Sequence, residues 1–277
     1  PRGVKRALEP DIMFLLPPMI FSAVTLYNNR REPLTQKAVM LIIFISVYIL
    51  HMIFAQTGWY FRYEAYLVAM GIVVLYIFIY EHLPCIRGEE KNMAPIFYKL
   101  KPVIYVIMIL SMAGRASSSF LVPQASNNIY EQQYQMAEFI KKNASGLNIA
   151  ANDIGMIGFY TDNKIIDLWG LADIDAAGYK LSKSYNTEKI GEITRKNNVQ
   201  LAIVFEHWFD QYGGLPADWV KIGEWKMSKL NVVCGSEVVA FYSIDRSGED
   251  LLRRKLAEFS KNIPPSGWDG AFSLANK

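Results

Sequence analysis

The sequence predicts an α-helical transmembrane bundle of about four spans, followed by a soluble α/β domain with a mostly parallel sheet. Long apolar blocks fill residues 11–113, whereas polar and apolar residues are mixed from residue 117 onward, as they are in globular proteins. In this second part, segments with helical and strand-like patterns alternate, which is typical of β-α-β units. We therefore expect a transmembrane region at residues 1–115 and an extracytoplasmic α/β domain at residues 116–277.

Four apolar blocks approach the length of a membrane-crossing helix, which needs about 20 residues. We expect the spans at residues 12–27, 38–55, 65–80 and 96–113. The second block contains no charged residue, and the third is followed by Glu81. The fourth reaches sufficient length only if Lys99 and Lys101 extend their ammonium groups to the membrane surface. For the second and fourth blocks, a buried core helix of a soluble protein is the alternative.

Positively charged residues near the span ends predict which loops face the cytoplasm, because Lys and Arg are enriched on that side of the membrane. Two of the links between spans are rich in such residues, namely Arg30, Arg31, Lys37, Arg87 and Lys91. The link between the second and third spans carries only Arg62. We therefore expect a multi-pass protein of the inner (plasma) membrane, in contact with membrane lipids, whose residues 56–64 and C-terminal domain face outward.

Charge and cysteine content argue against several other classes of protein. The formal net charge is only +3 and is scattered along the chain, so nucleic acid is not an expected partner. The predicted topology puts Cys85 and Cys234 on opposite sides of the membrane, which argues against a disulfide. Cysteine and histidine show no metal-ligand spacing. Because the chain begins at Pro1 with a loop-like sequence, we expect it to be the C-terminal part of a longer protein.

The outward turn between the second and third spans is the most polar and aromatic stretch of the membrane region. Arg62 offers a planar fork of donors that matches phosphate oxygens, and His51 lies near the end of a span, where a polar group is costly and often functional. We predict that His51, Arg62, Tyr63 and Glu64 bind an anionic lipid headgroup and a sugar hydroxyl. The alternative is an aromatic belt in which Arg62 extends to the membrane surface and pairs with Glu64.

The second part of the chain predicts alternating helices and strands. Helical spacing is found at residues 127–143, 187–197 and 249–261, and strand patterns at residues 147–151, 164–168, 199–205, 219–227 and 237–244. We expect the last two strands to form a hairpin at one edge of the sheet. A short helix should follow Asn152 or Asp153 as its N-cap, and Thr187 should cap the next long helix.

Polar side chains follow the predicted strands where the strands end. Ligands of open α/β sheets bind beyond the carboxyl ends of the strands, so Asn152, Asp153, Asp167 and Asp173 are candidate substrate-binding residues. Gly155 and Gly158 do not form a nucleotide-binding glycine motif. We expect no cofactor. A divalent cation held by aspartate oxygens is the alternative, against the commoner role of such aspartates as caps and loop formers; the set would be Asp153, Asp162, Asp167, Asp173 and Asp175.

Two segments carry a resemblance to a known superfamily. Residues 151–160, Ala-Asn-Asp-Ile-Gly-Met-Ile-Gly-Phe-Tyr, and residues 165–173, Ile-Ile-Asp-Leu-Trp-Gly-Leu-Ala-Asp, resemble paired motifs in the outer C-terminal domain of bacterial multi-spanning glycosyltransferases of the GT-C superfamily, of the arabinofuranosyl- and mannosyl-transferase type. The turn Phe61-Arg62-Tyr63-Glu64 is similar to an outer loop late in their membrane region.

The resemblance implies an enzyme that transfers a sugar from a polyprenyl-phosphate donor to an envelope glycan or lipid acceptor on the outer face of the membrane. It implies that Arg62 contacts the lipid phosphate, that Tyr63 and Glu64 contact the donor headgroup or sugar, and that the aspartates of the domain shape the face above the membrane site. In that superfamily the catalytic acidic residues lie in an early outer loop that this chain does not contain, so no residue inherits the catalytic role. The alternative function is a non-catalytic, membrane-anchored sensor that binds a glycan or another ligand.

Overall fold

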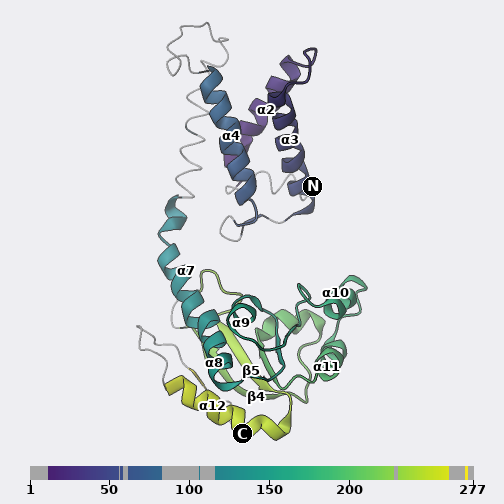
Figure 1. The fold of residues 1–277 in the computed structure, drawn as a ribbon, viewed down its shortest axis with the longest axis vertical. Coiled ribbons are helices and arrows are strands. Elements are labelled where there is room, and N and C mark those ends of the chain that lie inside the picture. The colour runs from purple at the N-terminus through teal and green to yellow at the C-terminus, as the bar shows by residue number, and fades with distance from the viewer. Residues whose placement is uncertain are drawn as a thin grey trace. The chain divides into compact units, whose positions relative to one another are not determined.

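A computed structural model describes residues 12–55, 57–58, 62–82, 106, 116–227, 230–261 and 272–273 (Figure 1). The chain divides into two compact units, Pro1–Leu121 and Val122–Lys277. The first is helical, and the second combines helices with a sheet. Each unit has hydrophobic clusters of its own, and each is described separately below.

Three helices and a short 3-10 turn form residues 13–82 of the first unit, as far as these residues are described, and residues 106 and 116–119 are also helical. The turn and the three helices are η1 (Met13–Leu15), α2 (Leu16–Asn28), α3 (Gln36–Phe54) and α4 (Ala65–His82). Pro17 and Pro18 lie in the first turn of α2, where the missing N–H of proline costs no helical hydrogen bond. Thr35 caps α3 by accepting a hydrogen bond of 3.1 Å from the Ala38 N–H.

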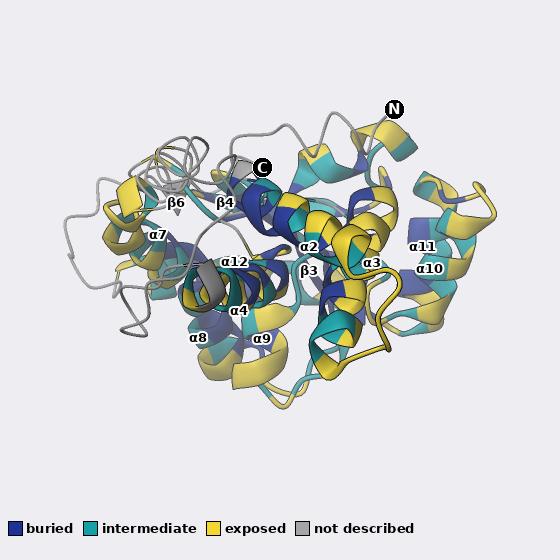
Figure 2. Ribbon diagram, turned by 90° about the horizontal axis from the view of Figure 1, so that it is seen from above, coloured by how far each residue is buried: buried dark blue, intermediate teal, exposed yellow. Residues whose placement is uncertain are grey.

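The helices of the first unit pack along one stripe of α3 and leave the rest of that helix exposed. Leu41, Phe44 and Tyr48 lie on the buried stripe at helical spacing and contact α2 and α4 through two hydrophobic clusters. The opposite side is apolar as well, because Ile49 and Ile53 are exposed there. Exposed residues, yellow in Figure 2, cover much of α3.

The prediction of a four-span transmembrane bundle is wrong. Within the described ranges, α3 is the one helix that is long and apolar enough to cross a membrane, with 19 residues. The proline pair starts α2 late, and its 13 residues span only about 20 Å. In α4 the apolar stretch Ala65–Tyr80 falls short of the required length. The fourth predicted span, residues 96–113, lies outside the described residues apart from residue 106.

The second unit begins with a helical run of three parts, α7 (Val122–Ile129), the π-helical turn η2 (Tyr130–Tyr134) and α8 (Gln135–Asn143). The other helices are α9 (Gly155–Tyr160), α10 (Ile174–Leu181), α11 (Thr187–Lys196), η3 (Glu206–Tyr212), η4 (Arg246–Gly248) and α12 (Glu249–Lys261). The strands are β1 (Ile149–Ala151), β2 (Ile165–Asp167), β3 (Leu201–Val204), β4 (Val220–Lys226), β5 (Val238–Ser243) and β6 (Phe272–Ser273).

The sheet is mixed, so the prediction of a mostly parallel sheet is wrong. Its strand order is β2-β1-β3-β5-β4-β6. β1 pairs in parallel with β2 and β3, whereas β5 pairs antiparallel with β3 and β4, and β6 antiparallel with β4. The hairpin of β4 and β5 causes this difference. The two strands pair as predicted, but β5 also pairs with β3 and runs antiparallel to it.

Helices cover both faces of the sheet, as the alternation of side chains along each strand requires. On β1, Ile149 and Ala151 face a cluster that includes residues of α8, α9 and α12, whereas Ala150 faces α10 and α11. The short connection from β1 to β2 therefore lies on one face, and the connection from β2 to β3 on the other (Figure 1). The two connections lie on opposite faces of the sheet, and they diverge at the neighbouring strands β1 and β3. Open α/β sheets bind ligands at such a point.

The other predicted elements are confirmed within a few residues at their ends. The short elements η3, η4 and β6 were not predicted, and three further differences concern α10 and two helix caps. Helix α10 was not predicted from the sequence. The short helix α9 begins after Ile154 without a side-chain cap, so neither Asn152 nor Asp153 caps it. Asn186, and not Thr187, caps α11 by accepting a hydrogen bond of 3.0 Å from the Lys189 N–H.

Candidate functional site

The candidate site lies at the carboxyl ends of the three parallel strands β1, β2 and β3. We call this side of the sheet the candidate edge. In the register of the sheet, Ala151 of β1 lies beside Asp167 of β2 and beside Ile203 of β3. The segments that leave these strands therefore start at one edge. Asn152 and Asp153 leave β1, residues 168–173 leave β2, and residues 205–212 leave β3. Asn152, Asp153 and Asp173 belong to these segments, and Asp167 is the last residue of β2.

Asn152 links the end of β1 to the end of β3 by two hydrogen bonds. Its Oδ1 accepts a hydrogen bond of 3.0 Å from the Phe205 N–H, and its Nδ2 donates one of 3.3 Å to the Phe205 carbonyl. The side chain is buried. The amide therefore satisfies both backbone groups of a residue just beyond β3. At the position where a ligand was predicted, this side chain joins two strands.

Asp167 organises the loop that follows β2. The carboxylate, in a residue only 2% exposed, accepts hydrogen bonds from the N–H groups of Trp169 at 2.8 Å, Leu171 at 2.5 Å and Ala172 at 2.7 Å. Hydrogen bonds to a charged acceptor are stronger than neutral ones. Asp167 therefore holds the loop in one conformation.

The rest of the Asp-Leu-Trp-Gly-Leu-Ala-Asp motif serves the same loop. Gly170 has φ +78°, and a Cβ atom there would lie 2.8 Å from the backbone nitrogen of Ala177. Asp173 caps α10 by accepting a hydrogen bond of 2.9 Å from the Ala176 N–H. Two residues predicted to bind substrate, Asp167 and Asp173, thus have structural hydrogen bonds to the backbone.

Asp153 lies in a polar cluster beside the π-helical turn η2. Its Oδ2 accepts a hydrogen bond of 2.9 Å from Gln133 Nε2. The buried Glu131 and the buried thiol of Cys234 are also in this region, and burial, followed by the charges of Asp153 and Glu131, raises the pKa of Cys234 to about 12. The thiol is therefore neutral at physiological pH and behaves as a small apolar group.

Three amide side chains on the helical run α7-η2-α8, which we call the amide row, bind the loop before β5. The sequence analysis missed them. Gln124, Asn128 and Gln132 follow each other at intervals of four residues and therefore lie on one helix face. The Nδ2 and Oδ1 atoms of Asn128 bond the Leu230 carbonyl at 3.2 Å and the Val232 N–H at 2.8 Å. The repeated spacing of amides was a signal in the sequence that could have revealed this contact.

Lys180 of α10 lies in a cage of aromatic rings, a second feature that the sequence analysis missed. Its Nζ is 3.2 Å from the ring centroid of Trp169 and 5.2 Å from those of Tyr185 and Tyr212. It also donates a hydrogen bond of 2.9 Å to the Trp169 carbonyl. The aromatic faces attract the ammonium, so Lys180 ties α10 to the loop organised by Asp167.

Burial lowers the pKa of Lys180 from its ordinary value of 10.5 to about 8, and the charge of Asp167 acts in the opposite direction. Between these two values the unfolded chain binds a proton that the folded protein has released, so the contribution of Lys180 to stability should increase as pH rises from about 8 to 10.5. Denaturant unfolding of wild type and Lys180→Met over this range measures the effect. Parallel pH curves for the two proteins would contradict the lowered pKa.

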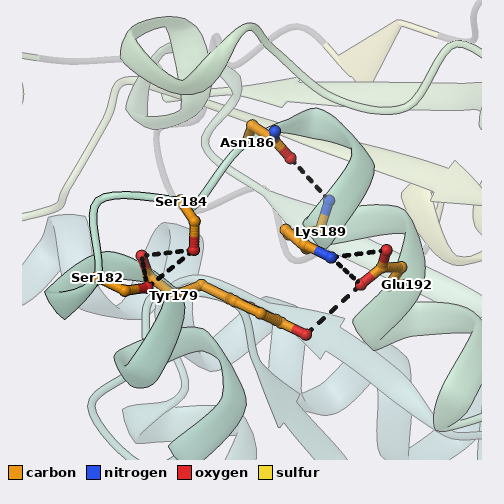
Figure 3. A network of polar contacts seen from close by, with 6 residues as sticks. All are labelled: Tyr179, Ser182, Ser184, Asn186, Lys189 and Glu192. Carbon is orange, nitrogen blue, oxygen red and sulfur yellow. Dashed lines mark hydrogen bonds and ion pairs between the residues drawn. The ribbon is translucent and has the colours of Figure 1, made fainter.

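The far end of α10 is joined to α11 by a further polar network (Figure 3). Lys189 Nζ bonds both carboxylate oxygens of Glu192, at 2.8 and 2.7 Å, and the Tyr179 hydroxyl donates to Glu192 at 3.5 Å. The hydroxyls of Ser182 and Ser184 donate to the Tyr179 carbonyl, at 3.1 and 3.5 Å. Exposed contacts of this kind are individually weak, but together they fix the turn that ends α10.

The predicted residues of the first unit form local contacts within that unit. His51 Nδ1 lies 2.6 Å from the Tyr66 hydroxyl. The Glu64 carboxylate, which is buried, accepts a hydrogen bond of 3.0 Å from the Gly58 N–H. Arg62 is exposed, and its guanidinium carbon lies 5.2 Å from the ring centroid of Tyr63. The ion pair of Arg62 with Glu64, which was the alternative prediction, is not among the ion pairs of the described residues.

Asp153, Asp167, Asp173 and Asp175 of the alternative cation site have separate partners. Asp167 and Asp173 bond backbone N–H groups, and Asp175 forms an ion pair of 2.5 Å with Lys196. Among the residues that the structure describes, no group of three or more His, Cys, Asp and Glu side chains is arranged to hold a metal ion.

Comparison with known proteins gives one match. Residues 127–242 match a family model described as a domain of unknown function, DUF8728. The match starts in α7 and ends in β5, so it includes the candidate edge and Asn128 and Gln132 of the amide row, but neither Gln124 nor α12. No curated protein and no solved structure matches the chain.

Proposed function

We propose that the chain is part of a membrane glycosyltransferase that transfers a sugar from a polyprenyl-phosphate donor to a glycan or lipid acceptor on the outer face of the membrane. The observation that carries the proposal is the position of the two segments that resemble such enzymes. The first begins at Ala151, the last residue of β1, and the second contains β2; Ala151 lies beside Asp167 in the parallel pair, and the loops of both segments leave one sheet edge. The two segments therefore belong to one β-α-β unit whose loops lie at the candidate edge.

The exposed apolar surface of α3 supports a location in the membrane. The core helix of a soluble protein is mostly buried, whereas only 28% of the apolar window of α3 is buried. Large side chains such as Leu50, Ile53 and Phe54 are exposed on it. Contact with lipid would remove this surface from water, and each buried CH₂ group contributes roughly 0.8 kcal/mol.

Membranes that contain the protein, expressed from its natural gene, should transfer labelled sugar from a polyprenyl-phosphate donor to a lipid- or glycan-linked product. Chromatography of the labelled products measures the transfer, and membranes without the protein give the baseline. Nucleotide sugars are the comparison donors, because they lack the polyprenyl chain. Transfer from nucleotide sugars alone, or equal product with and without the protein, would contradict the proposal.

Arg62→Ala should raise the apparent KM for the donor by about tenfold or more, because a charged hydrogen bond to phosphate contributes about 1.5–3 kcal/mol. Arg62→Lys should restore part of the loss, since lysine keeps the charge but not the planar fork. Arg30→Ala is the matched control, because the Arg30 guanidinium also lies over a tyrosine ring, at 4.2 Å from that of Tyr27. Equal kinetics for wild type and Arg62→Ala would remove Arg62 from the donor site.

A further inference from the structure

Helix α10 presents its large aliphatic side chains to solvent. Ile174 and Leu181 are 87% and 86% exposed and lie seven residues apart, which puts them on one side of the helix. The only fully buried residue of α10 is the small Ala176. Ordinary surface helices bury their aliphatic residues and expose polar ones. Leu171, in the loop that precedes α10, is also exposed, at 82%.

The position of these side chains is fixed by the structure around them. Leu171 is held through its own N–H by Asp167, and Asp173 caps the helix that starts at Ile174. Lys180 joins the helix to Trp169. These contacts anchor the segment that carries the exposed aliphatic residues, although burying those residues would remove apolar area from water.

The residues beside this surface have the composition of a protein segment at a membrane surface. Trp169, in the loop before α10, is half-buried, and Lys183, which follows α10, is exposed. Tryptophan is enriched at the interface between lipid and water, and lysine is attracted to anionic headgroups. The acidic residue on α10, Asp175, is paired with Lys196.

We infer that Leu171, Ile174 and Leu181, the α10 face, dock on the lipid surface and enter the boundary between headgroups and acyl chains. The apolar helix α3 in the same chain, with most of its window exposed, gives the reason to choose lipid over a protein partner. Amphipathic segments with aliphatic residues, Trp and Lys bind membranes in this manner. The inference rests on the membrane location in the proposed function, but not on sugar transfer.

Nitroxide labels on the full chain, reconstituted into vesicles of phosphatidylcholine and phosphatidylglycerol, test the inference. Labels are placed singly at Leu171→Cys, Ile174→Cys and Leu181→Cys, with Cys85 and Cys234 replaced by alanine. Leu251→Cys on α12, 50% exposed, is the control for an exposed leucine outside the α10 face. Thermal melting of each labelled protein checks that it is folded.

At the α10 face, collisions with oxygen, which dissolves in lipid, should be several-fold more frequent than at Leu251, and collisions with a water-soluble nickel chelate several-fold less frequent. Nickel accessibility equal to that at Leu251 would overturn the inference. Protection from both reagents would also overturn it, because it would indicate a protein contact. Lipid contact without sugar transfer would retain the inference and refute the proposed function, and transfer with a water-exposed α10 face would do the reverse.

Discussion

Asp167→Ala should destabilise the second unit by about 3 kcal/mol or more, the largest effect that we expect from any aspartate substitution in the described residues. Three backbone N–H groups would lose their acceptor, and the buried position of the carboxylate restricts replacement by water. The loop would then lose its conformation, and with it the cage around Lys180. Asp167→Asn should have a smaller effect, because its amide oxygen still accepts part of these hydrogen bonds.

Thermal and denaturant unfolding of the purified chain in detergent measure this loss. Asp218→Ala is the matched control, since Asp218 is exposed in the loop before β4, and surface substitutions usually change stability by less than about 0.5 kcal/mol. A destabilisation of Asp167→Ala no greater than that of the control would contradict the anchoring role. The carboxylate would then be a candidate for direct substrate contact instead.

Gly170→Ala should destabilise the same loop by about 2 kcal/mol or more. The left-handed conformation of a non-glycine residue costs about 1–2 kcal/mol, and Gly170 has φ +78°. The added Cβ would also lie 2.8 Å from the Ala177 nitrogen and 3.1 Å from the Ala176 carbonyl carbon. Both contacts are with the backbone of α10, so relief requires the helix to move.

Gly178→Ala is the control for Gly170→Ala, because it adds the same methyl group within α10, the helix against which the loop packs. At Gly178 no atom lies within 4 Å of the added Cβ, and alanine in a helix is more stable than glycine by roughly 0.5–1 kcal/mol. The two substitutions should therefore change the melting temperature in opposite directions. If both lower it equally, the loop is not held against α10 as described.

The fold of the second unit was predictable where the local pattern was strong. The four apolar residues of β3 are all buried, and the amphipathic pattern of α12 gave the helix with the ends that the structure shows. Helix α10 was missed because its apolar pattern is reversed: Ile174 and Leu181 point to solvent, and a periodicity argument assumes that such residues point to the core. The direction of β5 was missed because no local feature of the sequence specifies a strand's neighbour.

In the first unit, composition located the apolar blocks correctly but did not predict the lengths of the helices that they form. The helix from the first block begins only at Leu16 and ends at Asn28, and the apolar part of α4 ends before Glu81. Where helices begin and end depends on prolines, caps and turns, whereas average hydropathy does not record these.

The sequence by itself determined that an apolar helical region precedes an α/β domain, and that the polar residues after β1 and β2 lie at one edge. Only the tertiary structure decided what those residues do: Asn152 joins two strands and Asp167 holds a loop. It also brought Lys180 between aromatic rings from separate segments. The physical reason is that the partners of a buried polar group lie far away along the chain, such as Phe205 for Asn152, and local periodicity carries no information about distant contacts.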